Sequence, residues 1–347
     1  MTAKNERAVR ELPPVDESKS HDASALAETA PLPARISNIR LGTAGFTDRT
    51  LIESRSFYPR GVTSSEARLR HYAAHFPLVE IDATYYSLLP PSSAERWTQN
   101  TPPDFRIDVK AFPLFTEHPI DVRKLPQDLR QPLVSLGHEQ RVYPKDLPPE
   151  LAAEMANRFL ALLEPLRAAG KLGAVLLQFP PWFTATRGNA QRIEALRTAY
   201  PQVPFAVEFR HGSWFESARQ ERVFSLLARH AMSYVSVDQP NLPFLPAVTH
   251  PELAYLRFHG HNVEGFGKRG ASVIERFCYL YSPQELAPWV APVRRLAGNA
   301  REVHVLFNNC VRNFAVLGAK DLAALLAQEP SSALSRAETV SDGGAPC

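Results

Sequence analysis

The fold is decided by residues 172–209, LGAVLLQFPPWFTATRGNAQRIEALRTAYPQVPFAVEF. Two short apolar runs, at 172–179 and 204–209, flank a segment at 190–200 whose apolar residues recur with helical spacing. Two strands that are joined through a helix pair in parallel, because a crossover of this length returns the chain in the same direction. The stretch therefore predicts one βαβ unit of a parallel sheet.

The same alternation extends over most of the chain. Apolar strand-like runs are predicted at 39–43, 78–84, 105–111, 172–179, 204–209, 233–238, 253–260 and 302–308. Helical patterns separate most of them, at 64–76, 150–170, 190–200, 221–230 and 283–297, and a last one follows at 319–328. Eight such units predict an α/β fold, a (β/α)8 TIM barrel in a single domain. An open, doubly wound sheet is the alternative, although no GxGxxG follows the first strand.

The ends of the chain and one internal stretch depart from this pattern. Residues 1–35 and 329–347 are polar or rich in small residues, which predicts disordered terminal tails around a barrel at 36–328. Residues 113–149 hold seven prolines and no clear period. A connection of that length after the third strand is expected to be an insertion or a functional flap.

The composition is that of an ordinary water-soluble protein. The 347 residues are 44% hydrophobic and 22% charged, with a net charge of +3 and no dense basic block. The three cysteines have neither zinc-binding spacing nor an even count, which fits a reducing cytoplasm. No apolar run approaches the roughly 18 residues of a membrane span, so no membrane association is expected.

Alternation within the strands predicts which side chains face the barrel axis. In residues 105–110, Phe105, Ile107 and Val109 share one parity while the other parity is charged. The apolar set must face the helices, so the charged set faces inward. The deep inward positions are Arg40, Glu80, Arg106, Asp108, Arg257 and His304. Since buried charges need partners, these residues are expected to form a structural lattice of ion pairs.

A second inward layer lies where the strands end. Its predicted members are Gly42, Asp82, Lys110, Gln178, Glu208, Asp238, His259 and Asn308. Active sites of TIM barrels lie at this C-terminal end of the strands. Seven of these eight side chains can donate, accept or transfer a proton, which indicates a functional site rather than a purely structural one.

These residue types suit two chemistries. In acid–base catalysis, Glu208 and Lys110 would form the proton-transfer pair, with Asp238, His259 and Asp82 in support. In metal-assisted catalysis, the carboxylates and imidazoles would hold a divalent ion instead, and the sequence leaves that alternative open. The predicted substrate-binding residues are Arg210, His211, Trp214, Tyr85, Gln178, His118, Asn308, Asn309 and Gly42.

A set of linked motifs resembles one known family. The motifs are GTAGF (42–46), FYP (57–59), VEIDATYY (79–86), Trp97 with TPPDF (101–105) and VKA (109–111), LGAVLLQFPP (172–181), VEFRHGSW (207–214), YLRFHG (255–260), YLYS (279–282) with EL (285–286), and FNN (307–309). In this order they resemble the YecE-like family, domain of unknown function 72. The resemblance implies a TIM barrel and leaves the reaction open.

Departures from the family pattern weaken inference about the substrate. The family commonly has Asn-Ser-Thr-Phe-Tyr where this chain has residues 82–86, DATYY, and Arg where it has His261. The polar side chains at the strand ends lead us to expect an enzyme for a phosphorylated, sugar-like or nucleotide-like small molecule. The alternatives are a nucleic-acid-binding, metal-dependent phosphodiesterase and a non-catalytic ligand-binding barrel. The oligomeric state is left open.

Overall fold

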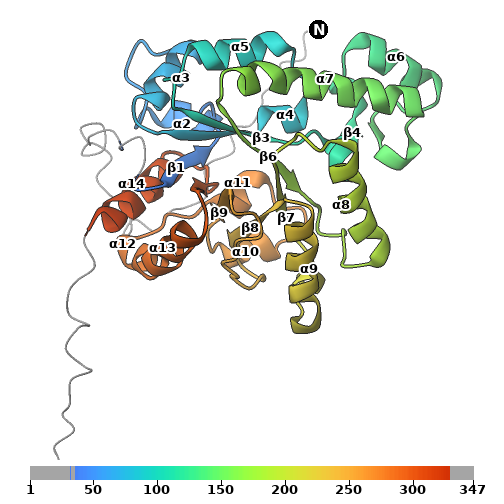
Figure 1. Cartoon of the computed structure of the whole chain (residues 1–347). Helices are drawn as coiled ribbons and strands as arrows, with labels where there is room; N and C mark the ends of the chain where they lie inside the picture. Colours follow the sequence, from blue (N-terminus) through green and yellow to red (C-terminus); the bar gives the residue numbers. More distant parts are fainter. Residues whose placement is uncertain (1–31, 33–35, 329–347) are drawn as a thin grey trace, which may run out of the picture.

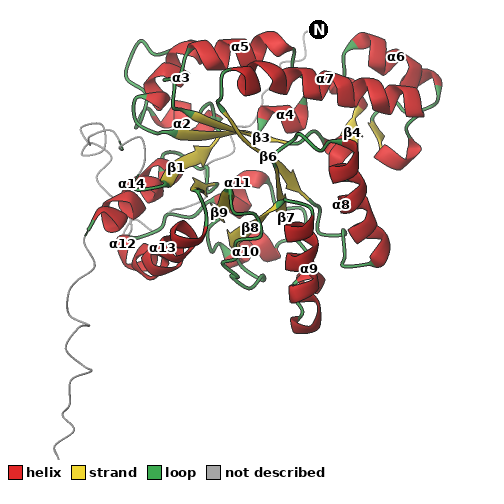
Figure 2. Cartoon of the chain, in the orientation of Figure 1, coloured by secondary structure: helices red, strands yellow, loops and turns green. Residues whose placement is uncertain are grey.

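Eight parallel strands close into a barrel in the computed structural model, which describes residue 32 and residues 36–328 (Figures 1 and 2). Neighbouring strands follow the order β1-β10-β9-β8-β7-β6-β3-β2, and β2 returns to β1. The strands are Ile39–Ala44 (β1), Leu78–Ile81 (β2), Arg106–Lys110 (β3), Leu172–Gln178 (β6), Phe205–Glu208 (β7), Ser233–Asp238 (β8), Leu253–Phe258 (β9) and Glu302–Phe307 (β10). The predicted (β/α)8 barrel is confirmed. The predicted tails lie almost wholly outside the described residues.

Helices surround the strands, as Figure 2 shows in red around yellow. They are Arg49–Ser54 (α2), Ser65–Ala73 (α3), Ala83–Tyr86 (α4), Pro91–Gln99 (α5), Pro149–Ala168 (α7), Arg187–Ala199 (α8), Ser217–Arg229 (α9), Val263–Gly267 (α10), Val273–Phe277 (α11), Pro283–Leu286 (α12), Val290–Asn299 (α13) and Phe314–Ala327 (α14). Between β8 and β9, the described residues 239–252 contain no helix. Their apolar side chains, including Phe244 against Trp289, join the core there instead. In the described part of the chain, none of the helices has the length and apolar character needed to cross a membrane.

The proline-rich stretch 113–149 folds as an ordered excursion after β3. It contains a two-stranded antiparallel sheet of Ile120–Asp121 (β4) and Arg141–Val142 (β5), and the helix Gln127–Ser135 (α6). Its buried side chains, such as Leu129 and Leu133, belong to the same apolar core as the barrel. Figure 1 shows α6 and β4 at the edge of the molecule, beside α7. The excursion matters for the site because it also carries His118.

Inside the barrel, apolar and charged side chains share the space. One apolar cluster contains inward residues from most of the strands: Leu78, Ala174, Leu176, Ala206, Val235, Val237, Tyr255 and Leu306. The charged side chains form two groups of ion pairs, so the predicted lattice is confirmed in outline. Glu302 belongs to the lower group, although the sequence did not single it out.

The lower group is built around His304, whose ring lies in the core. Its Nδ1 is 2.9 Å from Asp108 Oδ2, and Asp108 also accepts a 2.8 Å hydrogen bond from the Ala174 amide. That amide is freed by an irregularity in the pairing of β3 with β6. Glu302 pairs with Arg40 and lies 3.5 Å from His304 Nε2. Burial would lower the pKa of His304, but Asp108 and Glu302 raise it to about 9.

This raised pKa predicts a pH-dependent stability. The imidazolium stabilises the fold fully below its ordinary pKa of 6.5, and the stabilisation is lost as the pH rises through about 9. The loss should be on the order of 3 kcal/mol. In D108N the pKa of His304 falls, so the decline between pH 6.5 and 9.5 should flatten. Chemical denaturation at both pH values tests this, and an equal decline in both proteins would contradict it.

Candidate functional site

A chain of buried charges lies under the C-terminal mouth of the barrel. Arg257, on β9, donates a 2.5 Å hydrogen bond to Glu80 of β2 and a 2.6 Å bond to Glu208 of β7. Glu80 also accepts a 2.8 Å bond from the Tyr255 hydroxyl. Arg210 pairs with the other oxygen of Glu208. Arg257, Glu80 and Glu208 have no solvent-exposed surface, so each of these charges must be compensated by the partners just described.

Both carboxylate oxygens of Glu208 are engaged. Oε2 accepts a hydrogen bond from Arg257, and Oε1 accepts one, at 3.0 Å, from Gln178 and forms an ion pair with Arg210. Burial would raise the pKa of Glu208, but Arg210 and Arg257 hold it well below the ordinary value of 4.5. A carboxylate that is ionised, saturated and buried fits an electrostatic anchor better than the predicted acid or base.

Lys110 and Asp82 lie above this anchor, in the layer of side chains at the C-terminal ends of the strands, which we call the cup. The Lys110 ammonium lies 3.8 Å from Asp82 Oδ1 and 4.7 Å from the centre of the Tyr85 ring. Among the described residues, Oδ1 of Asp82 is buried without a hydrogen-bond partner. Side-chain exposures of 13% for Lys110 and 28% for Asp82 leave both reachable from the mouth. The pair therefore combines opposite charges with unused hydrogen-bonding capacity.

His118 reaches this cup from the excursion. Its Nδ1 is 2.9 Å from the Thr116 hydroxyl, and its ring contacts Tyr85 at 5.3 Å and Trp182 at 5.7 Å between centroids. Burial, together with the charges of Lys110 and Arg210, lowers the pKa of His118 to about 4. The ring is therefore neutral at pH 7, when it can donate from one nitrogen and accept at the other.

The opposite wall of the cup is formed by β8, β9 and β10. Arg210 donates a 2.7 Å hydrogen bond to Gln239 and lies 3.2 Å from His259 Nε2. The amide of Asn308 is 2.9 Å from Nδ1 of the same ring. Burial and Arg210 lower the pKa of His259 to about 3, so it is also neutral. Gln239 was not predicted because the sixth predicted strand ends one residue before it.

Two cavities adjoin the cup. One, of about 480 Å³, lies between the ends of β1 and β2 and the helices α3, α5 and α11. It is lined by apolar and aromatic side chains, with Asp82 and Asn308 among its polar groups. The second, of about 280 Å³, lies under the excursion and contains His118 and Trp182. Tyr86 lines both cavities.

Asp238 does not face the axis, so its predicted place in the ring is wrong. Its oxygens lie 2.5 Å from His261 Nε2 and accept a 2.5 Å bond from Tyr281. The inward parity of β8 is instead that of Val235 and Val237, which lie in the interior cluster. Both faces of β8 are buried, and here the apolar parity of Val235 and Val237 faces the axis while the parity that contains Asp238 faces outward, so the rule that the polar set faces inward fails on this strand.

Four further predicted binding residues lie outside the cup. Trp214 is buried in an aromatic stack with Phe209 and donates to the Phe183 carbonyl, so it is a core residue. Asn309 is fully buried and donates to the Tyr279 carbonyl. The His211 ring hydrogen-bonds to Ser213 in its own loop. A Cβ on Gly42 would come 2.1 Å from the Leu78 carbonyl oxygen, so the close approach of two strands requires this glycine.

The predicted site residues thus divide into those just described, which lie outside the cup, and those that the structure brings together. The second set lies in or directly under the cup and consists of Asp82, Tyr85, Lys110, His118, Gln178, Glu208, Arg210, His259 and Asn308. Within the described residues, no cluster of three or more His, Cys, Asp or Glu side chains is arranged to hold a metal ion. The convergent groups include two carboxylates, one ammonium and two imidazoles.

Comparisons with known proteins identify the family. Residues 40–341 match the family described as Protein of unknown function DUF72. The chain is 30% identical over 298 residues to UPF0759 protein YunF of Bacillus subtilis (strain 168), covering 83% of this chain and 94% of YunF. It is 25% identical to UPF0759 protein YecE of Escherichia coli (strain K12) over 172 residues, 48% of this chain and 50% of YecE.

Solved structures show the same relationship. A DUF72 family protein from Enterococcus faecalis V583 has a TM-score of 0.66 at 27% identity, covering 84% of this chain and 96% of that one. Another, from Thermotoga maritima MSB8, has a TM-score of 0.65 at 30% identity, covering 84% and 99%. The chain belongs to the DUF72 family, as its motifs predict.

Replacing Glu208 tests its role as an anchor. In E208Q, Arg257 and Arg210 lose a buried counter-charge, so the free energy of unfolding should fall by about 3–5 kcal/mol. The exposed pair of Arg49 with Glu53 supplies the control, and E53Q should change stability by less than about 0.5 kcal/mol. Urea denaturation of the three proteins measures both effects. An E208Q protein as stable as the wild type would contradict the anchor role.

A second prediction concerns His118. Its imidazole should titrate with a pKa of about 4, because burial and two nearby cations oppose protonation. In K110M that pKa should rise, since one of the cations is gone. Proton NMR of the imidazole Cε1–H across pH 3–8 gives the pKa directly. The exposed K145M is the matched control, and an unchanged His118 pKa in K110M would place the two residues in separate environments.

Proposed function

We propose that this DUF72 protein is an enzyme that moves protons on an oxygen-rich, sugar-like or nucleotide-like small molecule held at the C-terminal mouth of the barrel. The observation that carries the proposal is the unused hydrogen-bonding capacity of Lys110 and Asp82 inside a cup whose other charges are paired. Catalytic groups must have atoms left for the substrate, and these two residues do.

The contrast with Glu208 supports this assignment. Glu208 accepts hydrogen bonds from Arg257 and Gln178, forms an ion pair with Arg210 and has no exposed surface. Lys110, in contrast, makes one loose ion pair and one contact with an aromatic face in the described structure. A substrate oxygen could therefore approach the ammonium without displacing a strong partner.

The roles follow from charge and position. The Asp82 carboxylate would take a proton from a carbon next to a substrate carbonyl, and it would return that proton to the neighbouring position. The Lys110 ammonium would stabilise the negative charge that develops on the carbonyl oxygen. Neutral His118 could pass a proton between two substrate oxygens, since it can donate and accept at once. Such a sequence is an isomerisation, in which atoms and charge balance without a further reactant.

The adjoining 480 Å³ cavity supports a cyclic or partly apolar substrate. Its lining includes Phe46, Trp97 and Phe277, and Asp82 stands among its polar groups. Aromatic walls with a few polar groups are typical of sites for small organic ligands. Rings of sugars or bases pack well on such walls.

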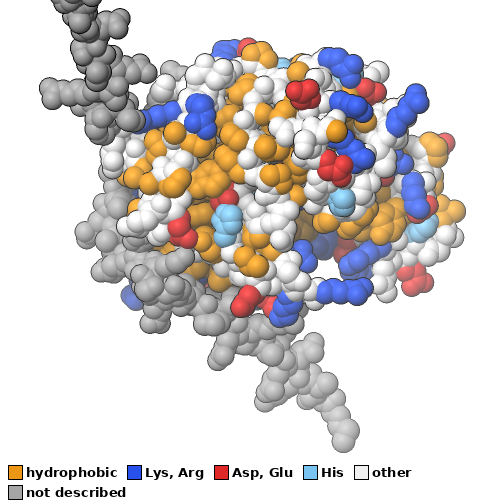
Figure 3. Space-filling model, turned by 90° about the horizontal axis from the view of Figure 1, so that it is seen from below, with side chains coloured by type: hydrophobic (Ala, Val, Ile, Leu, Met, Phe, Trp, Pro, Cys, Tyr) orange, Lys and Arg blue, Asp and Glu red, His pale blue; other side chains and the backbone are white. Residues whose placement is uncertain are grey.

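The nucleic-acid alternative has less support. On the face shown in Figure 3, Lys and Arg side chains are interspersed with Asp, Glu and hydrophobic ones. Strong binding to a phosphate backbone uses a continuous basic surface. The three cysteines, far apart in sequence, fit a reducing compartment, and we propose a cytoplasmic location.

The proposal predicts exchange of substrate protons with solvent. Wild-type protein is incubated in D2O with a panel of aldoses, ketoses, their phosphates and nucleosides, and loss of C–H signals is followed by proton NMR. K110M and D82N should each reduce the exchange rate by roughly 10²-fold or more, the usual contribution of a positioned acid or base. K145M, which alters an exposed lysine, should retain the wild-type rate.

The variants also separate the possible outcomes. If K110M and D82N fold normally and exchange the substrate at the wild-type rate, the two residues are not the proton-transfer groups. If the wild type binds a panel compound without exchange, the barrel is a ligand-binding protein.

A further inference from the structure

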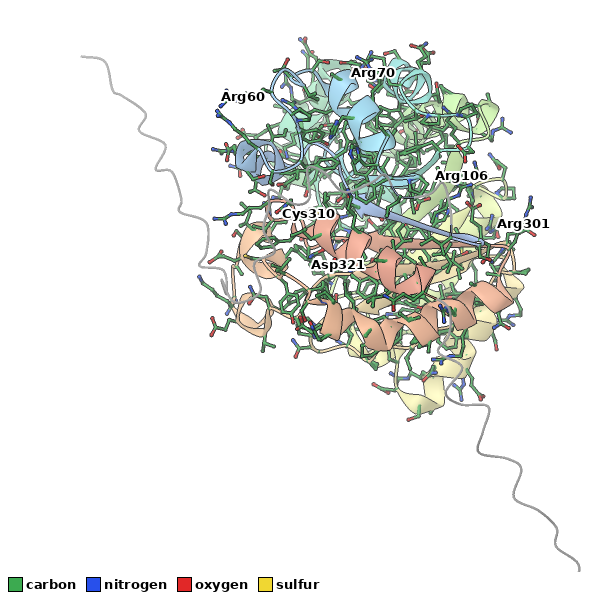
Figure 4. All side chains as sticks on the ribbon, turned by 90° about the vertical axis from the view of Figure 1, so that its left-hand side faces the viewer. Arg60, Arg70, Arg106, Arg301, Cys310 and Asp321 are labelled. Carbon is green, nitrogen blue, oxygen red and sulfur yellow. The ribbon has the colours of Figure 1, made fainter. Side chains whose placement is uncertain are left out.

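A third cavity, of about 490 Å³, lies at the N-terminal end of the barrel. Figure 4 shows two of its residues, Arg106 and Arg301, at the end of the molecule opposite Cys310, which lines the upper cavity. The basal cavity is therefore separate from the proposed catalytic cup. Its ionisable lining residues are Arg106, Arg167, Arg197, Arg301, His250, His304, Glu252 and Glu302.

Positive charge predominates in this lining. Four arginines and the protonated His304 face two carboxylates, while burial lowers the pKa of His250 and favours its neutral form. Asp108 and Glu164, which pair with His304 and Arg167, add two negative charges outside the lining. Cations still outnumber carboxylates, so the cavity favours an anion.

His304 presents an unused donor in this cavity. The side chain is 1% exposed, and among the described residues its Nε2 has no hydrogen-bond partner. Glu302 Oε1 lies 3.5 Å away, which is an ion-pair distance rather than a hydrogen bond. Because Nδ1 is committed to Asp108, the buried Nε2–H is the ring donor that remains for a further acceptor beside Glu302.

Arginine supplies further donors. Arg106 uses Nη1 for a 2.9 Å bond to the Gly170 carbonyl and Nε for a 3.5 Å ion pair with Glu302, and in the described structure Nη2 makes no hydrogen bond. Arg197 donates from both terminal nitrogens to carbonyls, while its buried Nε has no partner among the described residues. The guanidinium fork matches the spacing of phosphate oxygens.

Gly173 keeps the cavity open beside His304. A Cβ at this position would lie 2.7 Å from His304 Cε1 and 2.3 Å from Asp108 Oδ1. Any larger residue would displace the imidazole from its ion pair. The glycine therefore allows the ring to line the cavity and to remain paired with Asp108.

We propose that the basal cavity binds a small anion with two or more negative charges, of the phosphate or pyrophosphate class. Arg106 and His304 are its principal donors, and Arg301 and Arg167 attract it at the rim. The cavity volume falls within the range of small-ligand sites, about 300–1,000 Å³. Such an anion would stabilise the lower end of the barrel at a distance from the cup.

Calorimetric titration of the full chain at low ionic strength tests the site with inorganic phosphate, pyrophosphate and citrate as separate probes. Saturable binding is expected, strongest for pyrophosphate and weakened by added salt. R106Q should weaken it by roughly tenfold or more, because a charge-assisted donor is lost. R49Q, which removes an exposed arginine far from the cavity in sequence, and K110M, which alters the cup, should bind as the wild type does.

Three results would overturn the proposal. The first is that none of the three anions binds saturably. The second is that R106Q and R49Q weaken anion binding equally. The third is that K110M abolishes binding, which would place the anion in the cup. Stronger binding of citrate than of pyrophosphate would overturn the phosphate class. If R106Q does not fold, the double variant R167Q/R301Q takes its place in the comparison with R49Q. The side chains of Arg167 and Arg301 are 60% and 79% exposed.

Discussion

The position of Arg257 between Glu80 and Glu208 is the constraint on which the upper barrel depends. The Arg257 guanidinium has no contact with solvent, so its charge must be compensated by carboxylates. Each of these carboxylates, Glu80 and Glu208, must itself be paired with a cation. The consequence is a continuous set of contacts that joins β2, β9 and β7 across the axis. This arrangement fixes the relative height of three strands, and so it also fixes where their last inward side chains emerge.

The charges below are held in short ion pairs, whereas the layer above contains a loose one. Because Glu208 and Arg210 neutralise each other, the charge balance of the cup rests on Lys110 and Asp82, which touch only loosely. The pKa values of His118 and His259 are lowered because both rings are buried and because cations lie beside them, so both imidazoles are neutral. Under the proposed function, a substrate that binds in this layer would displace few strong ionic contacts.

Strand alternation was sufficient to predict the fold and much of the cup. It succeeded where one face of a strand is charged, as in β3 with Asp108 and Lys110. It failed for Asp238, because on β8 the apolar side chains Val235 and Val237 face the axis and the parity of Asp238 faces outward, the reverse of the pattern on β3. Trp214 was misplaced because an aromatic residue after a strand can pack inward as readily as it can line a rim. The position of His118 in the cup could not be predicted in detail, because it depends on the path of the proline-rich excursion, whose sequence has no clear period.

Connecting segments such as that excursion tolerate change better than the strands that they join. His118 belongs to a segment that branches off after β3, whereas the anchoring charges belong to the strands themselves. Changes in the length or sequence of the branch could exchange one wall of the cup while the barrel stays intact. Members of one family could then share a scaffold and its inner charges yet differ in the molecules that they accept.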